Sequence, residues 1–255
     1  MGVVNVTPDS FSDGGRFLDA NAAIAHARAM IDQGVDLVDV GGESTRPGAA
    51  SVAEAEELAR ILPVVTALRD IPVSVDTRRA NVMRAVLDAG ASMINDIEAL
   101  SAPGALAAVA GSDCALCLMH KKGDPATMQE DPRYADVVAE VREYLAGRIA
   151  ACEAAGVARG RIVADPGFGF GKTVEHNLTL LKRLPELAAL GVPLAAGWSR
   201  KSSLGRITGR EPGERLAGSL AAALLALMGG ARILRVHDVK ETRDLVLVWE
   251  AWRQA

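Results

Sequence analysis

The stretch VAEAEELARILPVVTALRDIPVSVD, residues 52–76, contains the pattern that decides the fold of this chain. Its first part, residues 52–70, carries apolar residues at helical spacing. Its last part, PVSVD (72–76), is a short Val-rich run that ends in an aspartate. A helical segment next to a short apolar strand is the repeating unit of an α/β protein.

Short apolar runs of the same kind recur along the whole chain, separated by longer segments with helical spacing such as ANAAIAHARAMIDQG (20–34). The other runs are MGVVN (1–5), DLVDV (36–40), SMIND (92–96), CALCLMH (114–120), RIVAD (161–165), PLAAG (193–197) and ILRVH (233–237). They lack polar alternation, which is typical of strands buried on both faces of a parallel sheet. Eight strand–helix units in 255 residues predict an α/β protein, a closed (β/α)8 TIM barrel that forms a single domain over residues 1–255. A doubly wound open sheet is the alternative.

The composition is that of a globular protein, with 49% hydrophobic and 24% charged residues. The net charge of −4 argues against nucleic acid or an anionic membrane as a partner. The longest apolar stretch, residues 216–231, is shorter than the roughly 18 residues that suggest a membrane span, and it reads as a helix packed on the sheet. The chain opens without a secretory signal. We therefore expect a soluble, cytoplasmic protein.

Two of the three cysteines, Cys114 and Cys117, form a C-x-x-C pair within an apolar run. Residues three apart on a strand point to opposite faces, so these two thiols cannot chelate one metal ion. The chain has no second pair to complete a zinc site. We interpret both cysteines as core residues.

Polar residues stand at or just beyond the carboxyl end of nearly every predicted strand. They are Asn5, Glu43, Asp76, Asn95, Asp96, His120, Asp165, Lys201, Arg235 and His237. The carboxyl ends of the strands in a (β/α)8 barrel converge on one rim, and the active site lies there. Although any one of these residues could be a strand-end or helix cap, the whole set predicts a functional site at the rim.

The glycine-rich stretch ADPGFGFGKT (164–173) resembles a phosphate-binding loop, but its spacing excludes that assignment. Three residues separate Gly167 from Gly171, whereas the phosphate-loop pattern requires four before its Gly-Lys. We predict instead that the glycines turn the chain sharply, so that Asp165 and Phe170 line the cavity. Lys172 is then expected to be a surface charge of the loop rather than a phosphate clamp.

The rim combines groups that suit an aromatic heterocycle. Asp76, Asn95 and Asp165 end three predicted strands and offer mixed hydrogen-bond donors and acceptors among apolar residues. A carboxylate can accept two hydrogen bonds from an N–C–N edge, which makes Asp165 the first candidate for a guanidine-like edge.

The other part of the rim suits an anion. Arg235 and His237 alternate in the last run and are expected to face the same way, and Arg46 adds positive charge. Asn5 and Asp13 offer the oxygen ligands that Mg²⁺ prefers beside phosphate oxygens. Together these groups indicate a heterocyclic pyrophosphate ester whose pyrophosphate is displaced.

The chain resembles the dihydropteroate synthase family along its whole length. The motifs that carry the resemblance are NVTPDSFSDGG (5–15), DVGGESTRPGA (39–49), SVDT (74–77), INDI (94–97), CLMH (117–120), DPGFGFGKT (165–173), SRKS (199–202) and RVHDVKET (235–242). Any one of them alone is weak, but all of them in order are specific. The resemblance implies condensation of 6-hydroxymethyl-7,8-dihydropterin pyrophosphate with p-aminobenzoate, giving 7,8-dihydropteroate and pyrophosphate.

The resemblance also implies site residues. It places the pterin on Asp76, Asn95, Ile97, Met119, Asp165, Gly197 and Lys201. It places the pyrophosphate on Thr45, Arg46, Arg235 and His237, and magnesium on Asn5 and Asp13. It places p-aminobenzoate on Phe11, Pro47, Phe170, Lys201 and Ser202. The catalytic residues are then Asp76, Lys201, Arg235 and His237.

The electron-rich dihydropterin suggests a dissociative displacement, with Asp76 stabilising the developing cation. We assign no general base, because an aryl amine is already neutral at pH 7. The resemblance further implies a homodimer, competition by sulfonamides at Phe170 and Ser202, and loops around 7–16 and 44–50 that order over the substrates.

The match has one departure, and two rival functions stay open. The family usually carries a segment before the first barrel strand, and here Met1 stands in place of an internal residue. A pterin-dependent methyltransferase shares the fold and a similar pterin pocket but needs no pyrophosphate machinery. A silent paralogue would bind pterin without condensing it.

Overall fold

The computed structural model describes residues 1–6, 16–43, 52–124 and 127–255. Its eight parallel strands are hydrogen-bonded in sequence order. They are β1 (Gly2–Asn5), β2 (Val38–Gly41), β3 (Val73–Asp76), β4 (Met93–Asp96), β5 (Ala115–Met119), β6 (Ile162–Asp165), β7 (Leu194–Ala196) and β8 (Ala231–Leu234). Gly2 bridges in parallel to Val236, and the Val3 N–H donates to the Val236 carbonyl at 2.9 Å. The last strand segment therefore meets the first, which confirms the barrel and not the open sheet.

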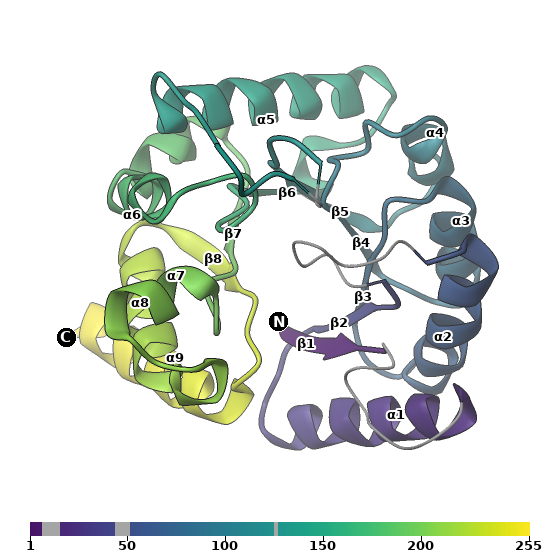
Figure 1. Cartoon of the computed structure of the whole chain (residues 1–255). Helices are drawn as coiled ribbons and strands as arrows, with labels where there is room; N and C mark the ends of the chain where they lie inside the picture. The colour runs from purple at the N-terminus through teal and green to yellow at the C-terminus, as the bar shows by residue number, and fades with distance from the viewer. Residues whose placement is uncertain (7–15, 44–51, 125–126) are drawn as a thin grey trace.

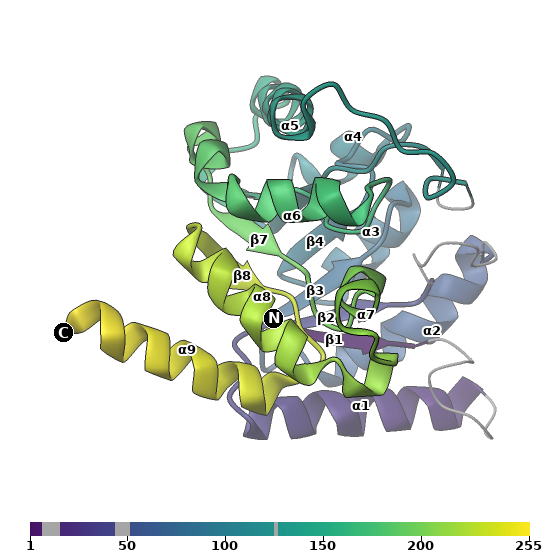
Figure 2. The same cartoon turned by 60° about the vertical axis from the view of Figure 1, so that its left-hand side comes forward.

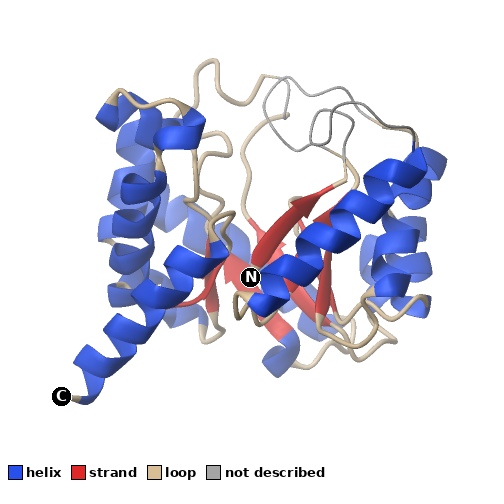
Figure 3. Cartoon of the chain, turned by 90° about the horizontal axis from the view of Figure 1, so that it is seen from below, coloured by secondary structure: helices blue, strands red, loops and turns tan. Residues whose placement is uncertain are grey.

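Helices surround the ring of strands (Figures 1 and 3). They are α1 (Arg16–Asp32), α2 (Glu54–Ala67), α3 (Ala80–Asp88), α4 (Ala105–Val109), α5 (Val137–Ala154), α6 (Val174–Lys182), α7 (Ser202–Thr208), α8 (Leu216–Met228) and α9 (Val239–Gln254). Figure 2 shows α9 beside α8 on one side of the barrel. The Ala-rich segment after Arg215 is a helix packed on the barrel, as predicted, because Ala222, Ala223 and Ala226 are buried. No helix within the described ranges is long and apolar enough to cross a membrane.

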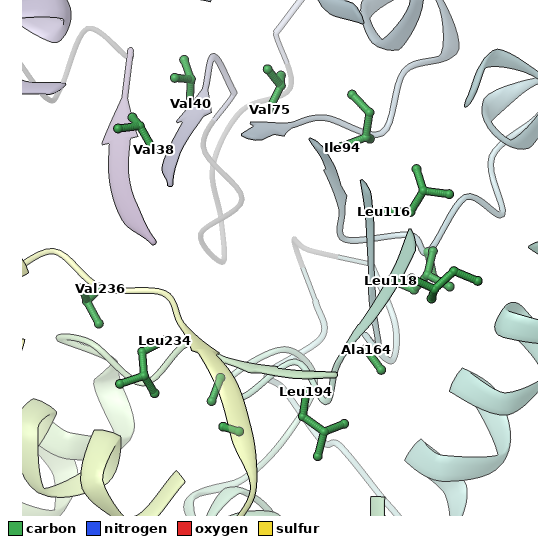
Figure 4. Close-up of a cluster of buried hydrophobic side chains, with 14 of the residues drawn as sticks. Val38, Val40, Val75, Ile94, Leu116, Leu118, Ala164, Leu194, Leu234 and Val236 are labelled. Carbon is green, nitrogen blue, oxygen red and sulfur yellow. The ribbon is translucent and has the colours of Figure 1, made fainter. Parts of the chain in front are cut away.

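Side chains alternate between the outside and the inside of the barrel. Val38, Val40, Val75, Ile94 and Leu116 point away from the ring toward the helices and belong to the large outer core (Figure 4). The inner core is a smaller cluster built around Met93, Cys117, Val163 and Ala195. Cys117 therefore lies inside the barrel, whereas Cys114 belongs to the outer core, and both are free thiols. The interpretation of both as core residues is confirmed.

The predicted bounds of the last strand were wrong. The apolar run at 233–237 suggested a strand there, but β8 runs over Ala231–Leu234. Gly230, with φ of 97°, turns the chain out of α8, so pairing to β7 already starts at Ala231. Arg235 and His237 therefore follow β8 rather than lie in it. The Arg235 N–H still donates to the Ala196 carbonyl at 3.0 Å, which keeps this segment beside β7.

Candidate active site at the carboxyl ends of the strands

One cavity opens at the carboxyl ends of the strands, and the acidic and amide residues predicted for the site line it. Asp76 ends β3 opposite Asn95 of β4, and Asp165 ends β6 opposite Met119 of β5. The full lining comprises Asp76, Asn95, Ile97, Met119, Asp165, Gly167, Phe168, Phe170, Gly197, Lys201 and Arg235. All the residues assigned to the pterin pocket by resemblance are in this set. The structure thus brings Asp165 and Arg235 to the same cavity.

Arg235 is held in this cavity by two carboxylates. Its Nε donates to Asp39 Oδ2 at 2.6 Å, and its Nη2 donates to Asp76 Oδ2 at 3.0 Å. Asp39 Oδ2 also accepts a hydrogen bond from Asn95 Nδ2 at 3.2 Å. Asp39 therefore links Arg235 and Asn95, two residues that line the cavity, through its buried carboxylate.

Asp39, which is completely buried in β2, was not among the predicted site residues. Its Oδ1 has no hydrogen-bond partner among the described residues, nor does Ser74 Oγ, the residue paired with it on β3. The available signal was a charged residue within an otherwise apolar run, which is costly unless it is paired. The hydrogen-bond partners of Asp39 are Asn95 in β4 and Arg235 in the segment after β8. They are distant in sequence, so no local pattern could predict them.

Burial shifts the protonation of the acids in the cavity. It raises the pKa of Asp76 to about 7, while the charge of Arg235 opposes the shift and that of Asp39 adds to it. Burial also raises the pKa of Asp165, against the hydrogen bond that the Gly167 N–H donates to its Oδ1 at 2.7 Å. Large pKa shifts of this kind are common among the charged groups of active sites.

The basic residues of the cavity are shifted in opposite directions. Burial lowers the pKa of Lys201 to about 8, with Asp165 opposing the shift. For Arg235, burial also disfavours the charge, but Asp39 and Asp76 outweigh it and raise the pKa above its usual value. Arg235 is therefore a permanent cation between two carboxylates.

Lys201 lines the cavity beside Phe170. It follows Arg200, which adopts a left-handed φ of 57°, and it precedes the first residue of α7, the exposed Ser202. Its Nζ lies 4.2 Å from the centroid of the Phe170 ring and donates to the Phe168 carbonyl. The β7–α7 and β6–α6 connections thus meet over the cavity.

Lys172 is not the surface charge that we expected. Its side chain is buried, and its Nζ lies 2.9 Å from His120 Nδ1 and 2.9 Å from the Gly167 carbonyl. Burial lowers the pKa of Lys172 well below its usual value, with the charge of Asp165 opposing the shift. The expectation failed because the loop folds back over its own lysine.

Three further rim residues, Asn5, Asp96 and His237, are not among the residues that line the cavity. His237 follows β8 and lies 3.0 Å from Ser199 Oγ through Nδ1. Asn5 ends β1 beside Gly41, where an added Cβ would lie 3.8 Å from Asn5 Oδ1 and 3.6 Å from Asp76 Cβ. Asp96 accepts hydrogen bonds from the Glu98 and Leu100 N–H groups at 2.8 and 2.9 Å, so it caps a turn.

Five predicted site residues lie outside the described residues: Phe11, Asp13, Thr45, Arg46 and Pro47. Within the described ranges, no group of three or more His, Cys, Asp or Glu side chains could hold a metal ion. Such a group is not required for Mg²⁺, because this ion keeps several waters and is bound through one or two protein oxygens plus substrate phosphates. The amide oxygen of Asn5 fits that kind of donor set.

Comparisons with known proteins agree with the geometry of the cavity. The sequence model of the family described as pterin binding enzyme matches residues 1–237. The dihydropteroate synthase of Escherichia coli (strain K12) is 52% identical over 254 residues, which cover 98% of this chain and 90% of the relative.

Solved structures are similar over the whole chain. A Yersinia pestis dihydropteroate synthase with a sulfonamide drug complex superposes with a TM-score of 0.95 at 48% identity, covering 100% of this chain and 94% of that one. A Xanthomonas albilineans dihydropteroate synthase in complex with 7,8-dihydropteroate gives a TM-score of 0.92 at 50% identity, covering 100% and 93%. These matches confirm the resemblance that the sequence motifs indicated.

Proposed function

This chain belongs to the pterin binding enzyme family, and from this premise we propose how its residues share the work of dihydropteroate synthesis. The reaction condenses 6-hydroxymethyl-7,8-dihydropterin pyrophosphate with p-aminobenzoate and gives 7,8-dihydropteroate and pyrophosphate. The observation that carries the proposal is the convergence of Asp76, Asn95, Asp165, Lys201 and Arg235 on one cavity.

The pterin ring binds deepest, on the acidic and amide side. Asp165 accepts two hydrogen bonds from the N–C–N edge of the ring, and Asn95, held by Asp39, reads a neighbouring edge. Ile97, Met119 and Gly197 supply the apolar walls, and Lys201 donates to the ring. Buried, preorganised partners of this kind fix the orientation of a flat ligand.

The pyrophosphate lies on the cationic side. Arg235 and His237 receive the leaving group, together with Thr45 and Arg46. Asn5 and Asp13 would hold Mg²⁺, which supplies charge neutralisation to the departing pyrophosphate when it is bound. Arg235 is well suited to this role because Asp39 and Asp76 fix its guanidinium in place.

Bond breaking comes before bond formation in this proposal. The C–O bond to pyrophosphate breaks, and the electron pair leaves with the pyrophosphate. The positive charge spreads over the dihydropterin, where the ionised carboxylate of Asp76 stabilises it. The neutral amine of p-aminobenzoate then forms the C–N bond and loses a proton to solvent.

p-Aminobenzoate enters last, over the pterin. Phe170, Lys201 and Ser202 line its pocket at the meeting of the β6–α6 and β7–α7 connections, and Phe11 and Pro47 complete it. Sulfonamides carry the same aryl amine, so they compete with p-aminobenzoate at Phe170 and Ser202.

Pyrophosphate release measured with and without p-aminobenzoate and with and without Mg²⁺ tests the function. We expect release that requires Mg²⁺, and a slower release that persists without the amine and yields the water adduct of the pterin cation. Release only in the presence of the amine would contradict the dissociative order. A methyltransferase would release no pyrophosphate, and a silent paralogue would bind the ester unchanged.

The oligomeric state and the location of the enzyme belong to the same proposal. Large apolar side chains are exposed on two adjacent helices, Leu225 and Met228 on α8 and Val248 and Trp252 on α9. This α8–α9 patch supports a homodimer, because exposed apolar patches mark protein interfaces. Three free, buried cysteines support a cytoplasmic location, which cell fractionation tests.

A further inference from the structure

The ammonium of Lys172 is buried inside the β6–α6 loop and contacts no carboxylate among the described residues. Its Nζ has three close acceptors: His120 Nδ1 at 2.9 Å, the Gly167 carbonyl at 2.9 Å and the Phe170 carbonyl at 3.1 Å. An ammonium has three hydrogens, so the three acceptors match its full donor capacity. A buried group whose hydrogen-bond donors all have acceptors holds those acceptors in a fixed arrangement.

His120 takes part in this arrangement as an acceptor. Burial and the charge of Lys172 lower the pKa of His120 to about 3, so its ring is neutral near pH 7. Nδ1 must then present its lone pair to Lys172, and the ring proton sits on Nε2. The ring packs edge-on against Tyr144, with centroids 5.0 Å apart, which holds its orientation.

The carbonyl groups of residues 167–171 are all engaged. Lys201 donates to the Phe168 carbonyl, Gln129 to the Gly169 carbonyl, and the Tyr134 hydroxyl to the Gly171 carbonyl at 2.8 Å. Lys172 donates to the carbonyls of Gly167 and Phe170, which lie on either side of Phe168 and Gly169. It is therefore the group that closes the loop on itself and ties it to the end of β5.

We propose that Lys172 is a positioning residue for p-aminobenzoate: through His120, Gly167 and Phe170 it fixes the loop that presents the Phe170 ring to the amine substrate. The inference rests on the proposed placement of p-aminobenzoate against Phe170. Lys172 itself is expected to touch neither substrate, because its side chain is buried and is not among the residues that line the cavity. Its effect on binding passes through the Phe170 backbone.

The test compares Lys172→Met with the unmodified enzyme in steady-state kinetics with both substrates varied. Met keeps the length and apolar stem of lysine but donates no hydrogen bond. We expect the KM for p-aminobenzoate to rise about tenfold, because the loop loses the hydrogen bonds that Lys172 donates to it. The KM for the pterin pyrophosphate and kcat should each change less than about threefold. Equal changes in both KM values, a loss confined to kcat, or no change would overturn the proposal.

Two further variants separate the proposal from its premise. Lys182→Met changes an exposed lysine on α6 and is expected to leave all three constants unchanged. Phe170→Ala is expected to raise the KM for p-aminobenzoate. If it does not, the placement of p-aminobenzoate is wrong; if it does and Lys172→Met has no effect, only the role of Lys172 is wrong.

A pair of His120 variants tests the same contact should Lys172→Met fail to fold. The Asn side-chain oxygen can replace Nδ1 as an acceptor, whereas Leu offers none. We expect His120→Asn to keep the KM for p-aminobenzoate within about threefold and His120→Leu to raise it several-fold. Nitrogen NMR of the unmodified enzyme should show His120 neutral with its proton on Nε2. Equal kinetics for the two variants, or a proton on Nδ1, would contradict the contact.

Discussion

The carboxylate of Asp39 determines where Arg235 points, although it lines no part of the cavity. Its Oδ2 accepts from Arg235 Nε at 2.6 Å and from Asn95 Nδ2 at 3.2 Å. Asp39→Asn keeps the size of the side chain and removes its charge. We expect kcat/KM for the pterin pyrophosphate to fall about tenfold or more, because a charge-assisted hydrogen bond is lost at a buried site. Steady-state kinetics check this, and Asp36→Asn, at an exposed residue, serves as the control.

The Asp39→Asn variant should also change how kcat/KM depends on pH. This ratio reports groups of the free enzyme. With the pKa of Asp76 raised to about 7 and that of Lys201 lowered to about 8, kcat/KM should rise as Asp76 ionises and fall as Lys201 loses its proton. Asp39 raises the pKa of Asp76 by repulsion, so Asp39→Asn should shift the acidic limb to lower pH. An acidic limb that stays in place would show that Asp76 does not control it.

Some residues of the site could be predicted from the sequence, and others could not. Asp76, Asn95 and Asp165 could be found because strand ends of a barrel share one rim, so position alone indicated a site. Asp39 and Lys172 could not, since the burial of a charge depends on partners from distant segments such as Arg235 and His120. The role of Asp165 toward an N–C–N edge followed from a carboxylate at a strand end, whereas the role of Phe170 toward p-aminobenzoate came from the family resemblance.

Among the connecting elements, the β6–α6 loop depends on two glycines that press against the chain that follows β5. Gly171 has φ of 64°, and an added Cβ would lie 2.1 Å from the Lys122 carbonyl oxygen. Gly167 has φ of 66°, and an added Cβ would lie 1.9 Å from the His120 carbonyl oxygen. Both glycines let the loop backbone approach the chain that follows β5, which explains a glycine-rich stretch that binds no nucleotide phosphate.

Gly171→Ala should therefore destabilise the protein. A methyl group at this position meets backbone rather than a flexible side chain, and the residue also needs a left-handed conformation. We expect the free energy of unfolding to fall by about 3 kcal/mol or more. Urea denaturation followed by circular dichroism measures the change. Gly160→Ala is the matched control, because an added Cβ there meets nothing within 4 Å. A loss no larger than that of the control would contradict the close approach.

The elements themselves were largely predictable from apolar runs, and their ends were not. The runs at 72–76 and 92–96 correspond to β3 (Val73–Asp76) and β4 (Met93–Asp96). The run at 233–237 failed, because pairing with β7 begins at Ala231, passes over the polar Arg232 at an irregularity in the register, and ends at Leu234. Apolar patterning reports burial, whereas the ends of a strand depend on hydrogen bonds to its neighbours.

At the scale of the whole molecule, the closed barrel followed from the repetition of one unit. Eight such units in this length leave few alternatives, because each strand needs helices over its outer face. Closure depends on contacts that no local pattern contains, including the bond from the Val236 N–H to the Met1 carbonyl at 2.9 Å and the bridge from Gly2 to Val236. The fold could therefore be predicted as a class, and its closing register could not.

The α8–α9 patch predicts that two copies of the chain associate through these helices. Leu225, Met228, Val248 and Trp252 are exposed together on adjacent helices, away from the cavity. Burying them against a second copy would remove their apolar surface from water, so the unmodified enzyme should sediment as a dimer. Placing charges in the interface, as in the double variant Leu225→Glu and Val248→Glu, should give the monomer mass in sedimentation equilibrium, because two carboxylates per subunit would have to be desolvated. Leu178→Glu, at an exposed leucine of α6, should leave the dimer intact. A double variant that keeps the dimer mass would place the interface on another face, and an unmodified enzyme that sediments as a monomer would remove the proposal altogether.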